Sequence, residues 1–323
     1  MEQLFRFRAA LILSLLFSLY PGFAVATPTV THALEVSNVS KAGLAWPNGN
    51  TVDISQYEGG KISWYYSWSA HPANSTLEFV PMFWGLQSSE DFNATIQQTL
   101  SDPRLNVTAL LGMNEPEQPG QSNITAQQGV DMWKTYVQPF NSTGLRLGSP
   151  ATSSGPSGKI WLQDFLTLCG DDCTVDFIAL HWYGTNASQF IAYVEDFHNT
   201  FNKTIWVTEW ACQNFVDFSA QCSDEDVRQF LNATQSYLDN ATFVERYSWF
   251  GAMKDMQGVN EDNALMGSNG SITSLGKQYA GMEGVDSQPI QPVAGLSSAS
   301  QLSFSPIYLA TFVAFYGAML TVF

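Results

Sequence analysis

Short apolar runs alternate with helix-like patterns along most of the chain. Runs that end in polar or turn-forming residues predict eight β-strands, at 41–46, 61–66, 78–83, 107–114, 145–149, 175–183, 205–209 and 245–250. Between them, apolar residues at helical spacing predict helices at 90–100, 125–137, 159–168, 190–201, 223–238 and 274–280. The connection 67–77 is rich in Ser, Pro and Asn, so no long helix is expected there.

This alternation predicts a single α/β domain with the architecture of a (β/α)8 TIM barrel, spanning residues 41–284. The span of about 240 residues is near the typical length of that fold. Two smaller α/β domains are the alternative, but no Pro/Gly/Ser-rich linker divides the middle of the chain.

One predicted strand ends in residues that could act in catalysis. The apolar run 107–113 is typical of a fully buried strand, although a run this short does not by itself exclude a helix. The strand must end near Glu115, because Pro116 has no N–H to donate to a neighbouring strand. Asn114 and Glu115 are therefore expected at the strand tip, where parallel barrels build their active sites.

The strand at 205–209 has the same design and ends in Glu209, between Thr208 and Trp210. Two glutamates at strand tips match retaining glycoside hydrolysis, in which one carboxyl protonates the leaving oxygen and the other attacks the anomeric carbon. The alternative is a pair of ordinary solvent-facing acids, which is less favoured because strands are poor in Glu. The predicted chemistry requires no metal and no cofactor.

Composition narrows the class of partner. The chain has 323 residues, of which 14% are aromatic, including ten Trp, and aromatic rings stack on the C–H faces of sugars. The formal net charge of −16 argues against nucleic-acid binding, which needs a basic surface, and suits a secreted protein.

The N-terminus has the pattern of a secretory signal peptide, predicted at residues 1–26. Arg6 and Arg8 precede an apolar run, and Ala24-Val-Ala26 is a small-x-small cleavage site. Residues 27–40 are then a lead-in segment.

The C-terminus has the pattern of a GPI-anchor signal. An uncharged apolar tail at 306–323 follows a linker and attachment region at 285–305 that is rich in small residues. A transmembrane helix is the alternative, but no basic stop follows the tail. The membrane is therefore expected as a partner only through the anchor.

Secretion fits two further features. N-glycans are predicted at eleven N-x-[ST] sequons, at Asn38, Asn74, Asn93, Asn106, Asn123, Asn141, Asn186, Asn202, Asn232, Asn240 and Asn269. The four cysteines predict two disulfides, and proximity favours Cys169–Cys173 and Cys212–Cys222 among three connectivities. A zinc site is the alternative, disfavoured because no close His/Cys cluster exists.

Four sequence segments together resemble glycoside hydrolase family 128, a family of clan A retaining glycosidases that are largely β-1,3-glucan hydrolases, many of them fungal. They are Gly112-Met-Asn-Glu-Pro-Glu117, Ile178-Ala-Leu-His-Trp-Tyr183, Trp206-Val-Thr-Glu-Trp210 and Tyr247-Ser-Trp-Phe250. The Asn-Glu-Pro motif alone is shared across the clan, whereas the combination is much more specific. The similarity covers about residues 42–283.

The resemblance implies roles for individual residues. Glu115 matches the general acid/base and Glu209 the nucleophile, while Asn114 matches the asparagine that hydrogen-bonds the sugar 2-hydroxyl. His181 and Tyr183 are expected to orient Glu209. Trp249 is the expected floor for the cleaved sugar, and the candidate sugar platforms are Trp46, Trp64, Trp84 and Trp210, with barrel packing an equal alternative for Trp64 and Trp84.

The proposed chemistry requires particular protonation states and a particular spacing of Glu115 and Glu209. Glu115 must be protonated, so burial or a negative neighbour should raise its pKa, while hydroxyl or imidazole donors should keep Glu209 ionised. The two carboxyls are expected roughly 5–5.5 Å apart.

The sequence therefore predicts a secreted or surface-anchored retaining endo-β-1,3-glucanase that acts on cell-wall glucan. One alternative is a non-catalytic β-glucan-binding or wall-structural protein on the same barrel. Another is a glycosidase of a different β-glycan, because linkage preference, endo or exo attack, and transglycosylation depend on the shape of the cleft.

Overall fold

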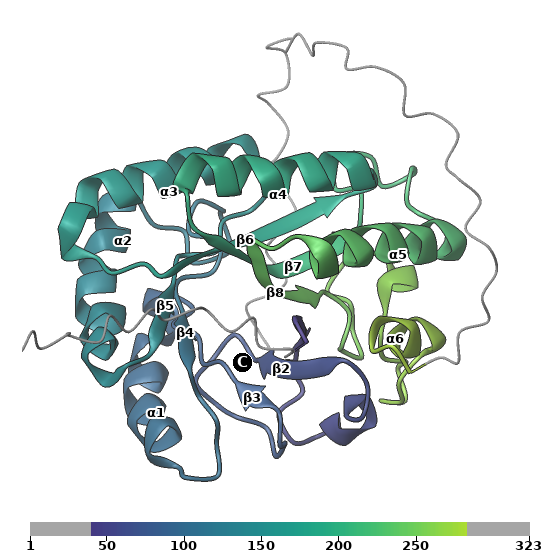
Figure 1. Ribbon diagram of the computed structural model, residues 1–323, viewed down its shortest axis with the longest axis horizontal. Helices are drawn as coiled ribbons and strands as arrows, with labels where there is room; N and C mark the ends of the chain where they lie inside the picture. The colour runs from purple at the N-terminus through teal and green to yellow at the C-terminus, as the bar shows by residue number, and fades with distance from the viewer. Residues whose placement is uncertain (1–39, 283–323) are drawn as a thin grey trace, which may run out of the picture. The chain divides into compact units, whose positions relative to one another are not determined.

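The computed structural model of the protein describes residues 40–282. The predicted signal peptide, the predicted anchor signal and the sequon at Asn38 lie outside the described residues. Figure 1 shows the strands at the centre, with helices packed around their outer side.

Eight parallel strands form one sheet in the order β3-β2-β1-β8-β7-β6-β5-β4. Their bounds are β1 (Ala42–Ala45), β2 (Ile62–Tyr66), β3 (Glu78–Phe79), β4 (Ala109–Leu111), β5 (Arg146–Gly148), β6 (Phe177–Gly184), β7 (Thr204–Cys212) and β8 (Val244–Trp249). The chain just beyond β3 joins the two ends of this order: Leu111 accepts a hydrogen bond from the Phe83 N–H at 3.0 Å and donates to the Pro81 carbonyl at 2.9 Å. The predicted (β/α)8 barrel is confirmed.

The helices follow the predicted positions with shifted ends. They are α1 (Ser89–Ser101), α2 (Ala126–Met132), α3 (Pro156–Cys169), α4 (Ala187–Phe201), α5 (Asp224–Asn240) and α6 (Ser274–Tyr279). Thr125 and Ser223 cap α2 and α5 through capping boxes, in which each of two side-chain oxygens accepts from a backbone N–H of the first turn. After Met132 the predicted helix continues as a π-helical turn, Trp133–Val137, and then as a 3-10 turn, Gln138–Thr143.

Three strands differ most from their predicted lengths. β3 is limited to Glu78–Phe79, shorter than the predicted 78–83. β7 continues to Cys212 because it pairs with β6 along its length, with His181 opposite Glu209 and Gly184 opposite Cys212. β4 is shorter than predicted, and beyond it Asn114 makes only an isolated bridge to Ala151. Glu209 therefore lies within its strand, whereas Glu115 follows the end of β4 by four residues.

The N-terminal end of the barrel is closed by ion pairs over aromatic rings. Arg246 on β8 contacts Glu78 on β3 with N···O distances of 2.7 and 2.9 Å. Its guanidinium lies 4.3 Å from the centre of the Trp206 ring, inside the barrel. Trp64 packs against Trp206 with ring centres 5.3 Å apart. These packed side chains fill this end of the barrel, so its role is structural.

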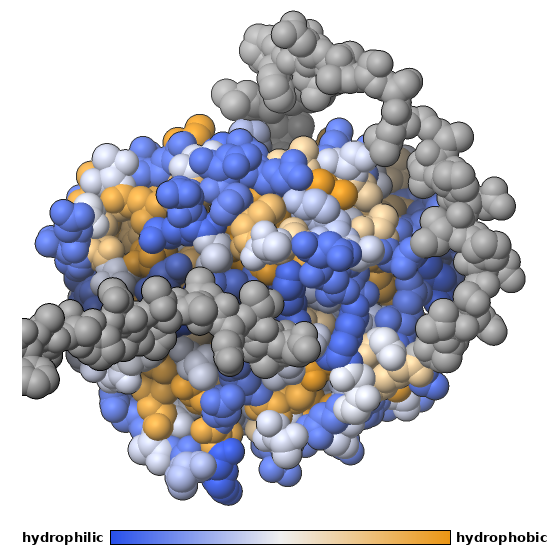
Figure 2. Space-filling model, viewed as in Figure 1, coloured by the Kyte–Doolittle hydropathy of each residue, from blue (hydrophilic) through white to orange (hydrophobic). Residues whose placement is uncertain are grey.

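Both predicted disulfides, Cys169–Cys173 and Cys212–Cys222, are present. Every sequon asparagine within residues 40–282 is exposed, and glycosylation there stays a prediction. In that part of the chain, no helix is both long and apolar enough to cross a bilayer. Figure 2 shows hydrophilic side chains interspersed with smaller hydrophobic areas on one face.

Candidate active site

Glu115 is held in an unusual backbone conformation at the tip of β4. Its φ is +38°, in the left-handed region that non-glycine residues seldom adopt, although a residue before a proline is normally extended. The Glu115 N–H donates to the Ala151 carbonyl at 2.7 Å, which fixes the peptide against the segment after β5. The residue is only 3% exposed. Such local strain is typical of functional residues that the surrounding structure holds in place.

Glu209 on β7 has a hydrogen-bond donor on each carboxylate oxygen. Trp68 Nε1 donates to Oε1 at 2.8 Å, and the Tyr183 hydroxyl donates to Oε2 at 2.6 Å. Two hydrogen bonds to one carboxylate fix its orientation. The arrangement therefore meets the requirement for a nucleophile that is held in one orientation.

His181 on β6 lies between the two glutamates and is fully buried. Its Nδ1 is 3.0 Å from Glu115 Oε1 and 3.4 Å from Glu209 Oε2. The nitrogen and one oxygen of each carboxyl all lie within 4.8 Å of one another. Retaining glycosidases place their carboxyls roughly 5–5.5 Å apart, whereas inverting enzymes leave roughly 6.5–9.5 Å for a water. Two carboxyl oxygens this close agree with the retaining spacing.

The electrostatics of this cluster favour retention of a proton. Burial raises the pKa of Glu115 above its ordinary value, and the negative charge of Glu209 adds to this effect, while the hydrogen bond from His181 opposes it. Burial disfavours the charged imidazolium, but the neighbouring Glu209 and Glu115 outweigh it and raise the pKa of His181. Glu115 and His181 thus both hold a proton more tightly than in water.

The same three side chains are of types that bind divalent transition ions. Double displacement at a retaining site uses one carboxyl as the acid and the other as the nucleophile, with no metal between them. The three side chains therefore also suit acid–base and nucleophilic chemistry without a metal.

Asn114 lies beside Glu115 and is 4% exposed. Its Nδ2 donates to Gln121 Oε1 at 3.1 Å, while its Oδ1 has no hydrogen-bond partner among residues 40–282. Of the residues predicted from the sequence, the fold brings together Asn114, Glu115, His181, Tyr183 and Glu209.

Three predicted substrate contacts are corrected by the structure. Trp46, Trp210 and Trp249 are completely buried, and their indole N–H groups donate to Gly49 O, Thr234 Oγ1 and Asn263 O respectively. Successive strand residues face opposite sides of a sheet, so with Glu209 facing the barrel interior, Trp210 faces the helices. Trp210 and Trp249 pack edge-to-face there, with ring centres 5.1 Å apart.

The other two platform candidates differ from each other. Trp64 is 1% exposed inside the barrel, so packing is its role. Trp84 is half-buried, and its backbone carbonyl accepts from the Asn114 N–H at 2.9 Å.

Sequence reasoning missed the aromatic residues that do surround the nucleophile. Trp68 contacts Glu209 directly, and Phe250 lies edge-on to both Trp68 and Tyr183, at 5.9 and 5.8 Å between ring centres. Phe215 lies 5.2 Å from Tyr183. Trp68 and Phe250 follow the last residues of β2 and β8, so the rule that strand tips carry function would have found them.

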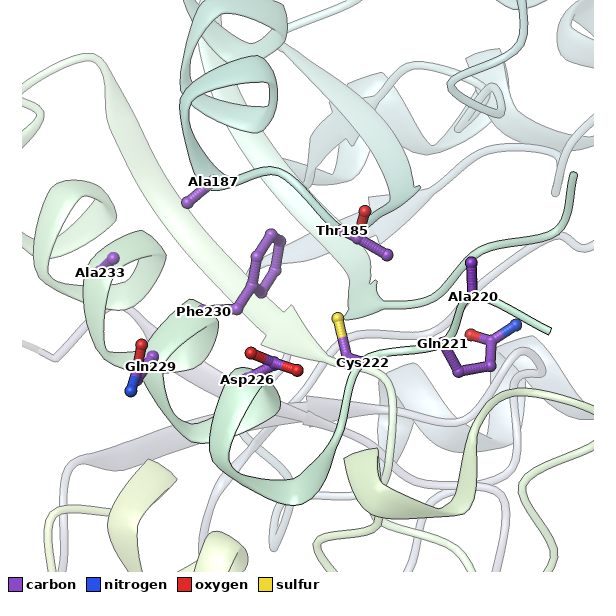
Figure 3. A pocket seen from close by; sticks show the side chains of 9 residues that line it. All are labelled: Thr185, Ala187, Ala220, Gln221, Cys222, Asp226, Gln229, Phe230 and Ala233. Carbon is purple, nitrogen blue, oxygen red and sulfur yellow. The ribbon is translucent and has the colours of Figure 1, made fainter. Parts of the chain in front are cut away.

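A cavity of about 430 Å³ lies beside the start of α4, near α5 and the loop after β7. Figure 3 shows Phe230 and Cys222 among the side chains that line it, with Thr185 on the β6–α4 connection. None of the catalytic candidates lines this cavity.

A closed parallel barrel with two buried glutamates close together at the tips of β4 and β7 defines the (β/α)8 glycoside hydrolases. Comparison with known families agrees, since the family described as "Glycosyl hydrolase catalytic core" matches residues 43–279. The chain belongs to this family and is a glycoside hydrolase.

Similar solved structures are members of glycoside hydrolase family 128, as the motifs predicted. An exo-β-1,3-glucanase from Blastomyces gilchristii is 32% identical, with a TM-score of 0.61, covering 74% of this chain and 97% of its own. An endo-β-1,3-glucanase from Amycolatopsis mediterranei, in complex with laminaritriose, is 28% identical, with a TM-score of 0.63, covering 76% of this chain and 100% of its own.

A curated relative is Alkali-sensitive linkage protein 1 of Schizosaccharomyces pombe, 34% identical over 251 residues. The match covers 75% of this chain and 45% of the relative, so the chain spans less than half the length of that protein.

Proposed function

We propose that the chain is a retaining endo-β-1,3-glucanase that acts on cell-wall glucan. The observation that carries the proposal is the close pair of buried carboxyls on Glu115 and Glu209, with His181 between them. The substrate follows from the similar structures, which include both endo- and exo-β-1,3-glucanases. The endo mode remains the expectation from the sequence, and the length of products released from long glucan tests it.

The geometry supports a double displacement. Glu115, whose pKa is raised by burial, protonates the leaving oxygen. Glu209, oriented by Trp68 and Tyr183, attacks the anomeric carbon and forms a glycosyl-enzyme. Glu115 then takes a proton from water, which attacks the same carbon from the face that the leaving group vacated, and the bond from that carbon to Glu209 breaks to release the carboxylate.

Secretion and attachment to the cell surface are part of the proposal. They are supported by the signal-peptide pattern, the apolar tail, the exposed sequons and the two disulfides. Phosphatidylinositol-specific phospholipase C should release the protein from membranes, unless remodelling of the lipid makes the anchor resistant. An intact Phe323 terminus on membrane-bound protein, found by mass spectrometry, would contradict the anchor.

The catalytic assignment is tested by azide rescue of two variants. With an activated aryl β-glucoside, Glu115→Ala should still form the glycosyl-enzyme but hydrolyse it slowly, and azide should yield a β-glycosyl azide. In Glu209→Ala, azide should fill the space left by the nucleophile and yield an α-glycosyl azide by one inversion. Swapped product configurations would reverse the two roles.

A second candidate is a non-catalytic glucan-binding or wall-structural protein. The observation that favours it is the name of the fungal relative, which describes a linkage protein. Folded wild-type protein that binds β-glucans but cleaves none of a panel of β-1,3- and β-1,4-glycans would support this candidate against the hydrolase. Cleavage of another β-glycan in preference to β-1,3-glucan would change the substrate and keep the chemistry.

A further inference from the structure

The cavity beside the start of α4 has an amphipathic lining. Phe230, Ala187 and Ala233 supply apolar surface, and Asp226 and Gln229 supply polar groups (Figure 3). Its volume of about 430 Å³ lies within the roughly 300–1,000 Å³ of small-ligand sites. Sugars have C–H faces that pack on aromatic rings and hydroxyl groups that need hydrogen-bond partners. The lining therefore suits a carbohydrate.

A sequon asparagine lies at the edge of this cavity. Asn186 stands between Thr185 and Ala187, both of which line the cavity, and is itself exposed. Its Oδ1 accepts a hydrogen bond from the Gln189 N–H at 3.0 Å, which caps α4. The cap uses the oxygen of the amide and leaves the nitrogen, the atom that carries an N-glycan. A glycan on Asn186 is therefore compatible with the cap and begins beside the cavity.

A second sequon asparagine near the cavity lies on another side of its helix. The residues of α5 that line the cavity, from Asp226 to Ala233, are three or four positions apart and share one face. Asn232 follows Phe230 by two positions, so at about 100° per residue it lies on nearly the opposite side of the helix from Phe230. Of these two asparagines, Asn186 is the better placed to put a glycan into the cavity.

We propose that this cavity binds the N-glycan on Asn186 of the same chain, so that the core sugars pack on Phe230 and cover the Cys212–Cys222 disulfide. Figure 3 shows the sulfur of Cys222 among the lining side chains, between Phe230 and Thr185. Cys212 ends β7, so the glycan shields the link that closes the loop after this strand. The inference rests on the proposed secretion, because N-glycans belong to secreted proteins.

Protection of the glycan from enzymatic release tests the inference. The full chain is produced in a yeast that attaches N-glycans, and native protein is treated with a peptide-N-glycosidase in heavy-oxygen water, which converts each freed asparagine to a labelled aspartate. Asn141, exposed in the 3-10 turn Gln138–Thr143, is the comparator. A glycan that occupies the cavity about nine-tenths of the time should be released about tenfold more slowly than the Asn141 glycan. After denaturation, the two rates should be equal.

Two alanine variants determine whether the cavity itself gives the protection. Ala233→Arg places a long side chain into the cavity from an exposed position of α5. Ala192→Arg makes the same change at an exposed position of α4 that does not line the cavity. Thermal unfolding establishes that both variants are folded at the assay temperature. Release at Asn186 should become fast in Ala233→Arg and stay slow in Ala192→Arg.

Three results of these release measurements would overturn the inference. The first is release from wild-type Asn186 as fast as from Asn141. The second is slow release that persists in Ala233→Arg, and the third is protection that is lost equally in Ala192→Arg.

Reduction of the disulfides provides an independent measurement. Ser188→Ala removes the sequon but keeps Asn186 and its cap. In glycosylated protein, dithiothreitol should reduce Cys212–Cys222 about tenfold faster in this variant than in the wild type, while the disulfide at the end of α3 is reduced at an unchanged rate. In protein made without N-glycans in the bacterial periplasm, Ser188→Ala should have no effect. An unchanged rate in glycosylated protein, or an equal effect in both preparations, would overturn the inference.

The same experiments separate this inference from the proposed function. Absence of glycans from every sequon would overturn the proposed secretion together with the inference. Fast release from an occupied Asn186, or an empty Asn186 beside an occupied Asn141, would overturn the inference alone. Neither measurement needs turnover of glucan, so slow release at Asn186 from a protein that cleaves no glucan would support the inference and overturn only the proposed glucanase activity.

Discussion

The Cys212–Cys222 disulfide provides a test of how the surroundings of the nucleophile are held. Cys212 ends β7, the strand of Glu209, and the disulfide closes the loop that carries Phe215. Phe215 packs against Tyr183, whose hydroxyl donates to Glu209. Replacing both cysteines by alanine should therefore loosen a contact two steps from the nucleophile.

The size of the effect on stability follows from the length of the closed loop. The sequence separation of 10 residues gives about 2.7 kcal/mol from the chain-entropy relation. Cys169–Cys173, at the end of α3, is the matched control, because its separation of 4 gives about 1.9 kcal/mol by the same relation. The two double-alanine variants should thus lose similar amounts of stability.

Activity should distinguish the two variants. We expect kcat/KM on an aryl β-glucoside to fall roughly fivefold to tenfold without Cys212–Cys222, about 1 kcal/mol in the transition state, and to stay unchanged without Cys169–Cys173. Urea unfolding followed by tryptophan fluorescence measures stability, and kinetics are taken where both variants are folded. Equal losses of activity would refute the reasoning, as would full activity without Cys212–Cys222.

Three further predictions test the division of roles within the barrel. Trp68→Phe keeps an aromatic ring but removes the hydrogen-bond donor to Glu209. Steady-state kinetics should therefore show a fall in kcat/KM of about tenfold to a hundredfold, with folding unchanged. Full activity of this variant would show that Trp68 does not orient Glu209. Arg246→Met leaves the Glu78 carboxylate without its cation at the N-terminal end of the barrel, where the side chains of Arg246 and Glu78 are only 18% and 10% exposed. Denaturation should therefore show a loss of about 1–3 kcal/mol in the free energy of unfolding, while kcat/KM stays unchanged. Adding Glu78→Gln should recover part of that stability. A fall in kcat/KM of the folded Arg246→Met variant would contradict a purely structural role for this end of the barrel. Because the pKa of Glu115 is raised, glucan hydrolysis should fall as the pH rises through that value and the acid loses its proton. With an activated aryl glycoside, Glu115→Gln should lose this alkaline limb, and a limb that persists would identify another group as the acid.

Much of the fold and the catalytic pair could be predicted from local sequence patterns. Buried parallel strands have short apolar runs, and a proline after Glu115 marks where the strand must stop. Because all strands of such a barrel run in the same direction, residues at their C-terminal ends must meet at one end. Glu115 and Glu209 were therefore predictable as neighbours although they lie far apart in the chain.

The aromatic surroundings could not be assigned in the same way. Whether a tryptophan beside a catalytic residue faces the substrate or the helices depends on a single step along the strand, because adjacent residues face opposite sides. Trp210 and Trp249 proved to be packing residues, while Trp68 and Phe250 lie at the site.

The contacts that orient the catalytic groups were decided by the tertiary structure. His181 reaches both glutamates because β6 and β7 pair with one register shift just before it, which places it opposite Glu209. Gln121 reaches Asn114 because the loop between them folds back onto the strand tip. A strand register and a loop path arise from many weak contacts across the whole domain, and no local pattern in the chain records them.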